Sequence, residues 1–222
     1  MVKIIFLGTA GDSSVTGRQL RASGGFVLQI GEFQIFFDPG PGALVRAKEF
    51  GINVRVTSAI IVSHNHLNHC NDLNALIDAM TLGGFDKKGV LITNPTVVNG
   101  SEKYTAALSS FHRGCLEHII ILRPEQKAAI GDAEIYAIAT AHAEPDGLAF
   151  RIVTPQYTIG YSGDTAYTKD LAHALEGADI LILNVTYPGD TKTDNHLNRE
   201  GVVNIITQVQ PKLAVITHFG FA

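Results

Sequence analysis

The sequence predicts an α/β (α+β) protein in which two groups of strands are each interleaved with helices. Short apolar runs bounded by Gly, Pro, Asn or Asp recur along the whole chain, and this pattern is typical of buried strands. Between them lie segments with apolar residues at helical spacing. The chain has 222 residues, of which 45% are hydrophobic, and this is enough for one domain with a sizeable core. We therefore expect a single domain, residues 1–222.

In the first half, Gly31 and Glu32 join two apolar runs with a two-residue loop, the signature of a β-hairpin. Pro41 suits the first turn of a helix that runs through Phe50. Ser101 suits the cap of a helix that extends to Ser109. The other elements expected here are strands at 2–7, 26–30, 33–37, 59–62, 90–93 and 118–122, and a helix at 70–80.

The second half is richer in strands. Turn residues separate the apolar runs, as in Glu144-Pro145-Asp146-Gly147. The expected strands are 133–140, 148–153, 157–161, 180–183 and 214–217, and the expected helices are 169–175 and 199–209.

Composition excludes several classes of protein. No apolar run reaches the roughly 18 residues of a membrane span, and the start of the chain has no room for a signal peptide. We therefore expect a cytoplasmic protein without membrane contact. Cys70 and Cys115 share no metal-binding spacing, and we predict that both are core thiols. A formal charge of −4 argues against a globally basic nucleic-acid binder but leaves a local basic patch open.

The strongest motif is the stretch Ser63-His64-Asn65-His66-Leu67-Asn68-His69, which directly follows the apolar run 59–62. At a strand end, His64 and His66 point the same way because side chains alternate with a period of two. His69 follows a short bend. Imidazole is the commonest protein ligand for borderline metals. A single histidine beside a strand is usually an ordinary polar residue, but three in one turn predict a metal site.

Four more polar residues follow expected strands in the second half: His142, Asp164, His196 and His218. Each residue alone is weak evidence for a metal site, since Asp164 could cap a helix and His196 could be a solvated loop residue. Together with the triple-histidine turn they predict a metal site at one set of strand ends. His112, His118 and His173 lack this context, and we assign them no role.

On these motifs the sequence resembles the metallo-β-lactamase superfamily, whose signature is His-x-His-x-Asp-His followed by a lone His, a Gly-Asp and a final His. The resemblance covers nearly the whole chain and includes the Asp38-Pro-Gly turn. Within the superfamily the sequence looks nearest to ribonuclease Z-like phosphodiesterases, on His196-Leu197 and on Thr217-His218-Phe219. The resemblance implies a four-layer αββα sandwich with metals at one edge of the paired sheets.

The resemblance also implies a ligand set. One metal would take His64, His66 and His142; a second would take His69 and His218; and Asp164 would bridge them. We expect zinc, one or two ions per chain, with manganese or iron as alternatives. The family's signature aspartate is Asn68 here, and a neutral amide is a poor zinc ligand, so we expect the second metal to bind more weakly.

The expected function is that of a metal-dependent hydrolase, above all a phosphodiesterase. Metal-bound hydroxide would attack, and His196 would act as general acid, with Asn68 beside the reacting water. Arg18 and Arg21 are the expected substrate-binding residues for a small anionic or phosphodiester substrate. Two alternatives stay open: a hydrolase of thioesters, lactones or other acyl compounds, and a metal-binding homologue that lost catalysis through Asn68.

Overall fold

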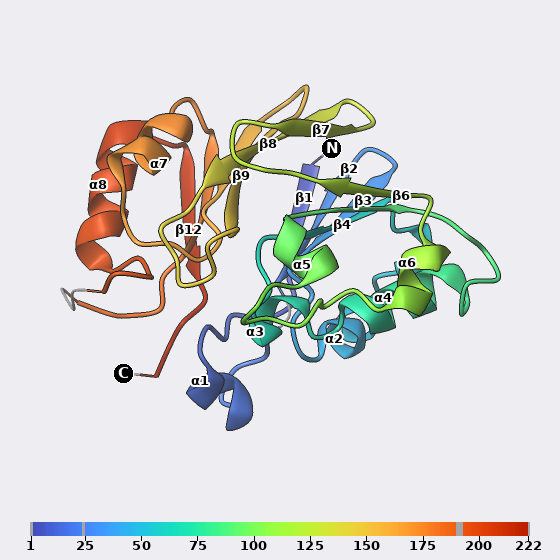
Figure 1. The fold of residues 1–222 in the computed structure, drawn as a ribbon. Coiled ribbons are helices and arrows are strands. Elements are labelled where there is room, and N and C mark those ends of the chain that lie inside the picture. The colour runs from blue at the N-terminus through green and yellow to red at the C-terminus, as the bar shows by residue number, and fades with distance from the viewer. Residues whose placement is uncertain (1, 24, 190–192, 222) are drawn as a thin grey trace. The chain divides into compact units, whose positions relative to one another are not determined.

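The computed structural model describes residues 2–23, 25–189 and 193–221, and these residues form two compact units. The β1–β6 unit comprises the described residues of 2–9 and 21–122, and the β7–β12 unit comprises those of 10–20 and 123–221. Each unit is built on one six-stranded mixed sheet with helices packed on it (Figure 1). The prediction of two strand groups interleaved with helices is confirmed.

The strands of the β1–β6 unit lie side by side in sequence order. The first three are antiparallel, and β3 through β6 are parallel. The elements are β1 (Val2–Phe6), β2 (Phe26–Ile30), β3 (Phe33–Phe37), α2 (Ala43–Glu49), a 3₁₀ turn (Val54–Val56), β4 (Ala59–Val62), α3 (Leu67–Cys70), α4 (Leu73–Thr81), β5 (Val90–Thr93), α5 (Pro95–Asn99), α6 (Ser110–Cys115) and β6 (His118–Ile121).

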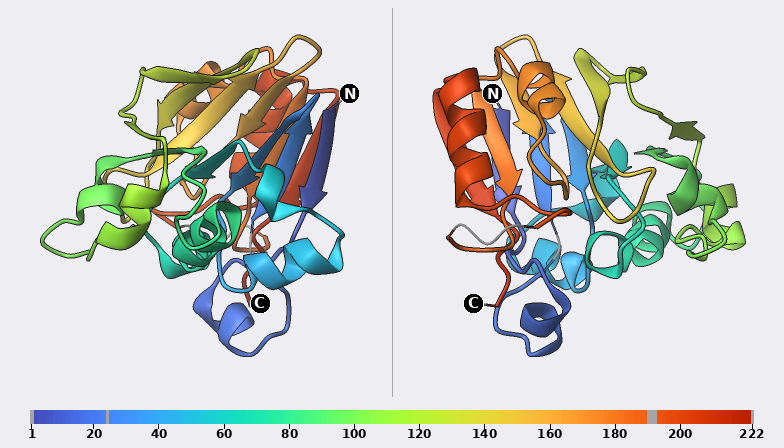
Figure 2. Two further views of the ribbon diagram at one scale, coloured as in Figure 1. Left: turned by 90° about the vertical axis from the view of Figure 1, so that its right-hand side faces the viewer. Right: turned by 60° about the vertical axis from the view of Figure 1, so that its left-hand side comes forward.

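One apolar core holds this unit together. Helices α2 and α4 lie against the sheet (Figure 2). Their buried faces pack on it through Ala47, Leu76 and Met80. On the sheet side they meet Phe36 and Ile60, which are fully buried. Cys70 and Cys115 belong to the same core, as expected for buried thiols.

The β7–β12 unit contains α1 (Ser13–Gly17), β7 (Lys127–Ile130), β8 (Ala133–Ala139), β9 (Leu148–Val153), β10 (Thr158–Tyr161), α7 (Lys169–Ala174), β11 (Ile180–Asn184), α8 (Arg199–Val209) and β12 (Leu213–Thr217). Strands β7 to β10 are antiparallel, and β10 to β12 are parallel. Helices α7 and α8 share a core with β11 (Figure 1).

Three predicted helices of the β1–β6 unit are wrong, one in its existence and two in their extent. Residues 101–109 form no helix: Ser101 Oγ accepts from the Tyr104 backbone N–H at 3.2 Å, but the Thr105 carbonyl accepts from the Asn65 amide at 2.8 Å, and the chain continues through bends. The expected helix 70–80 is interrupted before α4, where the Asp72 backbone N–H donates to the Pro39 carbonyl at 2.9 Å. Pro41 precedes α2 rather than lying in its first turn.

Five elements were not predicted: α1, the 3₁₀ turn, α5, α6 and β7. Strand β7 is the short edge strand of its sheet, and its Lys127 and Ala129 are exposed. Among the described residues, no helix is long and apolar enough to cross a membrane.

Candidate metal centre

In the β1–β6 unit the triple-histidine turn is organised by a buried carboxylate, that of Asp38. Asp38 follows β3, and His64 and His69 follow the neighbouring parallel strand β4. The Asp38 Oδ2 atom accepts from His69 Nδ1 at 2.8 Å and from Ser63 Oγ at 2.7 Å. Ser63 Oγ also lies 3.0 Å from His64 Nδ1. One carboxylate therefore orients two imidazoles through their Nδ1 atoms, directly and through a serine.

The backbone at Asp38 is strained to make this contact. Its φ is +47°, in the left-handed region that non-glycine residues rarely adopt. The Ser63 backbone N–H also donates to Asp38 Oδ1, at 2.7 Å, so both carboxylate oxygens are used. Backbone strain that a hydrogen-bond network holds in place is typical of functional sites.

His66 is oriented differently from its neighbours. Its Nε2 atom lies 3.2 Å from the Tyr104 hydroxyl, and its Nδ1 atom lies 2.9 Å from His64 Nε2. Tyr104 is presented by a tight turn in which the Ser101 N–H donates to the Tyr104 carbonyl at 2.7 Å. Asn65 holds this segment, because its amide donates to the Thr105 carbonyl at 2.8 Å. The His64 Nε2 and His66 Nδ1 atoms thus face one another.

Asn68 lies within α3 and does not cap a helix: His66 is the N-cap of α3, and Asp72 is the N-cap of α4. The Asn68 carbonyl accepts from Ser23 Oγ at 3.4 Å. Arg21 is two residues before Ser23 in the same unit, and its Nη1 atom lies 3.5 Å from Thr9 Oγ1. The segment that carries Arg21 therefore runs beside the turn that carries Asn68.

In the β7–β12 unit, Asp164 and His218 come together at the ends of β10 and β12. Asp164 Oδ2 lies 3.2 Å from His218 Nε2. Asn184, at the end of β11, fixes the other carboxylate oxygen, because its amide donates to Asp164 Oδ1 at 2.8 Å. His218 Nδ1 lies 3.0 Å from the Thr186 hydroxyl. Asp164 and His218 are both buried.

His196 and His142 belong to the same cluster of this unit. His196 Nδ1 lies 3.1 Å from the Thr186 hydroxyl and 3.8 Å from Asp164 Oδ2. The ring centroids of His142 and His196 are 5.0 Å apart. His142 Nδ1 donates to the Asn195 carbonyl at 2.8 Å, which leaves Nε2 as its ligand atom. The predicted site residues of this unit are thus side by side.

Arg18 is placed beside the chain that follows His218. Its guanidinium lies 5.2 Å from the centre of the Phe221 ring. Asp12, which caps α1, accepts from the Val15 and Phe221 backbone N–H groups at 2.7 and 2.8 Å. Burial raises the pKa of the Asp12 carboxyl, but these backbone hydrogen bonds outweigh it, and the pKa lies below its usual value. An ionised Asp12 therefore ties α1 to the end of the chain.

The donor atoms fit a divalent metal. A histidine ligand normally holds its second ring nitrogen in a hydrogen bond, and this fixes the tautomer and the ring orientation. His64, His66, His69, His142 and His218 all have such a partner. In the β7–β12 unit, ligand atoms of Asp164, His196 and His218 lie within 4.8 Å of one another, close enough to share one ion.

Sequence reasoning missed the residues that orient the ligands. Asp38 was noticed only as part of a turn, and Tyr104, Asn184 and Thr186 received no role. A buried asparagine at the end of the apolar strand β11 was an available signal, because a polar side chain there needs a partner. Tyr104 gave no local signal.

Comparison with known proteins identifies the family. Residues 34–219 match the family model described as "Beta-lactamase superfamily domain". The chain belongs to the metallo-β-lactamase superfamily. It is 34% identical over 221 residues to an uncharacterized protein of Methanocaldococcus jannaschii, covering 99% of this chain and 83% of that one.

Two further relatives extend the comparison. The crystal structure of the metallo-beta-lactamase fold protein YhfI from Bacillus subtilis matches 100% of this chain and 87% of that chain, with a TM-score of 0.83 and 22% identity. Ribonuclease Z of Methanopyrus kandleri is 27% identical over 151 residues, 68% of this chain and 50% of that protein. The fold prediction is confirmed: two mixed six-stranded sheets with flanking helices, in the metallo-β-lactamase fold. The donor set is that of a metal-dependent hydrolase of this superfamily.

Proposed function

We propose that this protein is a metal-dependent phosphodiesterase whose metal ions are bound jointly by the donor residues of the β1–β6 unit and those of the β7–β12 unit. His64, His66 and His142 would hold one ion, His69 and His218 would hold a second, and Asp164 would bridge them. The orientation of each imidazole by its own partner is the observation that carries the proposal. Bound zinc would supply Lewis-acid polarisation of a phosphoryl oxygen and activate water at neutral pH.

His196 has the surroundings of a general acid. Its Nδ1 atom faces the Thr186 hydroxyl at 3.1 Å, so proton transfer to a leaving oxygen is assigned to Nε2. A threonine hydroxyl has one donor hydrogen and two acceptor lone pairs. It can therefore accept from a protonated His196 or donate to a neutral one without moving. Asp164 Oδ2, 3.8 Å from Nδ1, would stabilise the protonated ring.

Two features favour a phosphodiester over a neutral acyl compound. Asn68 brings no negative charge to the triple-histidine turn, so the ligand set keeps more positive charge for an anionic substrate. Arg18 and Arg21 sit on segments that border the donor set of their own unit. The similarity to a ribonuclease Z is consistent with this substrate class. A small phosphodiester is proposed because the net charge of −4 gives no broad basic surface.

The test is a screen of the zinc-loaded protein with bis(p-nitrophenyl) phosphate and with a chromogenic thioester. We expect turnover of the phosphodiester, and His196→Gln should lower kcat by about 10²- to 10⁴-fold for a poor leaving group while zinc content is unchanged. Nitrophenolate leaves readily without protonation, so the fall in kcat of His196→Gln on bis(p-nitrophenyl) phosphate should be smaller. Turnover of the thioester alone would contradict the phosphodiesterase proposal, and turnover of neither would favour a homologue without catalysis.

A further inference from the structure

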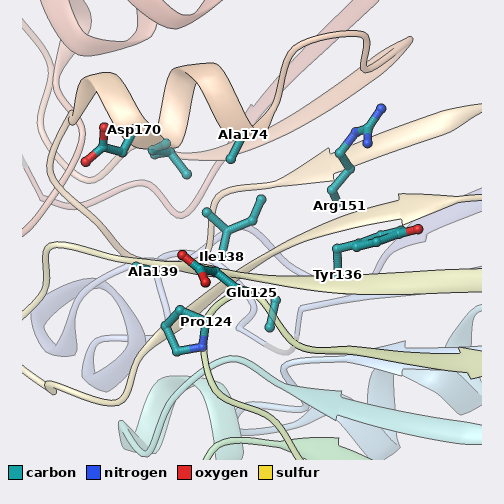
Figure 3. Close-up of a pocket in the computed structure, with 10 residues that line it drawn as sticks. Pro124, Glu125, Tyr136, Ile138, Ala139, Arg151, Asp170 and Ala174 are labelled. Carbon is teal, nitrogen blue, oxygen red and sulfur yellow. The ribbon is translucent and has the colours of Figure 1, made fainter.

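A pocket of about 420 Å³ lies on the β7–β12 unit, between α7 and the face of β8 (Figure 3). Helices α7 and α8 share their core with β11, and Ile138 of β8, which is partly buried, packs against that core. The pocket lies beside Ile138, between β8 and α7. Its floor and walls are apolar: Ile138, Ala139, Leu171 and Ala174. Its volume and its apolar lining are typical of sites for small molecules.

Opposite charges stand at the two ends of this pocket. Figure 3 shows the Glu125 and Asp170 carboxylates on one side of Ile138, and the Arg151 and Tyr136 side chains on the other. Arg151 is directly opposite Tyr136 in the β8–β9 register. Within the part of the chain that the structure describes, no ion pair joins Arg151 to either carboxylate.

The Arg151 end has an unmet hydrogen-bonding need. The Arg151 Nε atom is buried, and among the described residues it has no hydrogen-bond partner. A buried donor without an acceptor is costly, and arginine is the side chain best shaped to bind a carboxylate. The Tyr136 hydroxyl donates to Glu134 at 2.7 Å, so Tyr136 offers its ring rather than its hydroxyl to the pocket.

The carboxylate end is held by a strained backbone. Glu125 has a φ of +72°, which is rare for a residue with a side chain. Its backbone N–H donates to the Ala137 carbonyl at 2.9 Å, and this bond fixes it beside β8. Asp170, in the first turn of α7, lines the same end of the pocket from the helix side. Two carboxylates at one end form a site for an ammonium group.

We propose that this pocket binds a short peptide with free termini, its carboxylate against Arg151 and its ammonium against Glu125 and Asp170. The length fits: Glu125 is fixed beside Ala137 on one side of β8, and Arg151 lies opposite Tyr136 on the other side, two strand spacings or roughly 10 Å apart. An extended peptide of two or three residues spans about 7–10 Å. The apolar floor then accepts small side chains. This site is separate from the proposed phosphodiesterase chemistry and does not depend on it.

The probe is trialanine, titrated into the full chain by isothermal titration calorimetry, with and without zinc. We expect saturable binding that zinc does not change. N-acetyl-trialanine and trialanine amide should each bind at least about tenfold more weakly, because each loses one charge-assisted hydrogen bond. Arg151→Gln should bind trialanine as weakly as the wild type binds trialanine amide. Asp170→Asn should bind trialanine about as weakly as the wild type binds N-acetyl-trialanine.

Asp132→Asn and Lys87→Gln are the charge-matched controls, because both residues are exposed and neither lines the pocket. Both should bind trialanine like the wild type. If Arg151→Gln fails to fold, the exposed Asp170 still tests the ammonium end. No saturation at roughly 10 mM trialanine, or equal binding of the free and blocked peptides, would overturn the proposal.

Discussion

The Asp38 carboxylate accepts a hydrogen bond from His69 Nδ1 at 2.8 Å, and both side chains are almost fully buried. This contact joins the end of β3 to the turn that follows β4. It leaves Nε2 as the ligand atom of His69, and through Ser63 the same carboxylate orients His64. Asp38 is thus a positioning residue for two of the three histidines in the turn.

Asp38→Asn should lower zinc affinity by about 10- to 100-fold, the usual cost of losing a partner that orients a metal ligand. Asparagine keeps the shape and tolerates the left-handed backbone at this position, so the fold should persist. Competition with a chromophoric chelator measures the affinity. Asp78→Asn, an exposed acid of the same unit, is the control and should bind zinc like the wild type. Unchanged affinity in Asp38→Asn would contradict the positioning role.

Tyr104→Phe should weaken zinc binding by about tenfold, because His66 Nε2 loses the hydroxyl that fixes its tautomer. The phenyl ring keeps the packing of the turn. Tyr157→Phe removes an exposed hydroxyl elsewhere and should have no effect. If both variants match the wild type in the same chelator competition, the hydroxyl does not orient His66.

The shared ligand set is testable by counting ions. If His64 and His142 hold the same ion, His64→Ala and His142→Ala should each lose one zinc per chain, and the double variant should lose the same one. Separate sites would make the double variant lose two. Elemental analysis after zinc loading and desalting gives the count. His173→Ala is the control, since His173 is exposed on α7.

Much of the fold and of the donor set could be predicted from the sequence because their signals are local. Apolar runs gave β2, β3, β4 and β9 at their observed bounds. Metal-ligating residue types at strand ends gave the donor candidates. The partners that orient those donors could not be predicted, because they lie far away in sequence: Ser63 is 25 residues from Asp38, and His66 is 38 residues from Tyr104. The false helix at 101–109 has the same cause, since the distant Asn65 holds that segment.

Stability at acid pH should depend on Asp179, which links β10 and β12 in the β7–β12 unit. Its carboxylate pairs with Lys212 at 2.8 Å and accepts from the Thr158 backbone N–H at 2.8 Å. The Lys212 ammonium, then the Thr158 N–H, hold the pKa of Asp179 below its usual 3.8. Its contribution is therefore full above about pH 4 and is lost as the pH falls through the lower folded value.

Asp179→Asn should consequently lower the free energy of unfolding at pH 7 and have a smaller effect near pH 2, because the wild-type carboxyl loses its charge as the pH falls through its lowered pKa. Urea unfolding at the two pH values measures the difference. Asp132→Asn, at an exposed position, should show no such pH dependence. An equal loss of stability at both pH values would mean that Asp179 acts through packing rather than through its charge.

The last prediction concerns Asn68, which stands where the superfamily signature has an aspartate. Asn68 lies inside α3, and the N-caps of α3 and α4 are His66 and Asp72. Asn68→Asp should therefore not act by changing a cap. It would place a carboxylate in the turn that carries His64, His66 and His69, and a carboxylate oxygen is a far better zinc ligand than an amide oxygen.

We expect wild-type protein titrated with zinc to bind one ion tightly and a second weakly, and Asn68→Asp to bind two tightly, with a higher rate on a phosphodiester. Asn71→Asp adds the same charge one helical turn away and should leave the stoichiometry unchanged, because it cannot replace the signature residue. Two equally tight sites in the wild type would show that the amide does not weaken the second site. A higher zinc stoichiometry in both variants would mean that added negative charge alone retains the second ion.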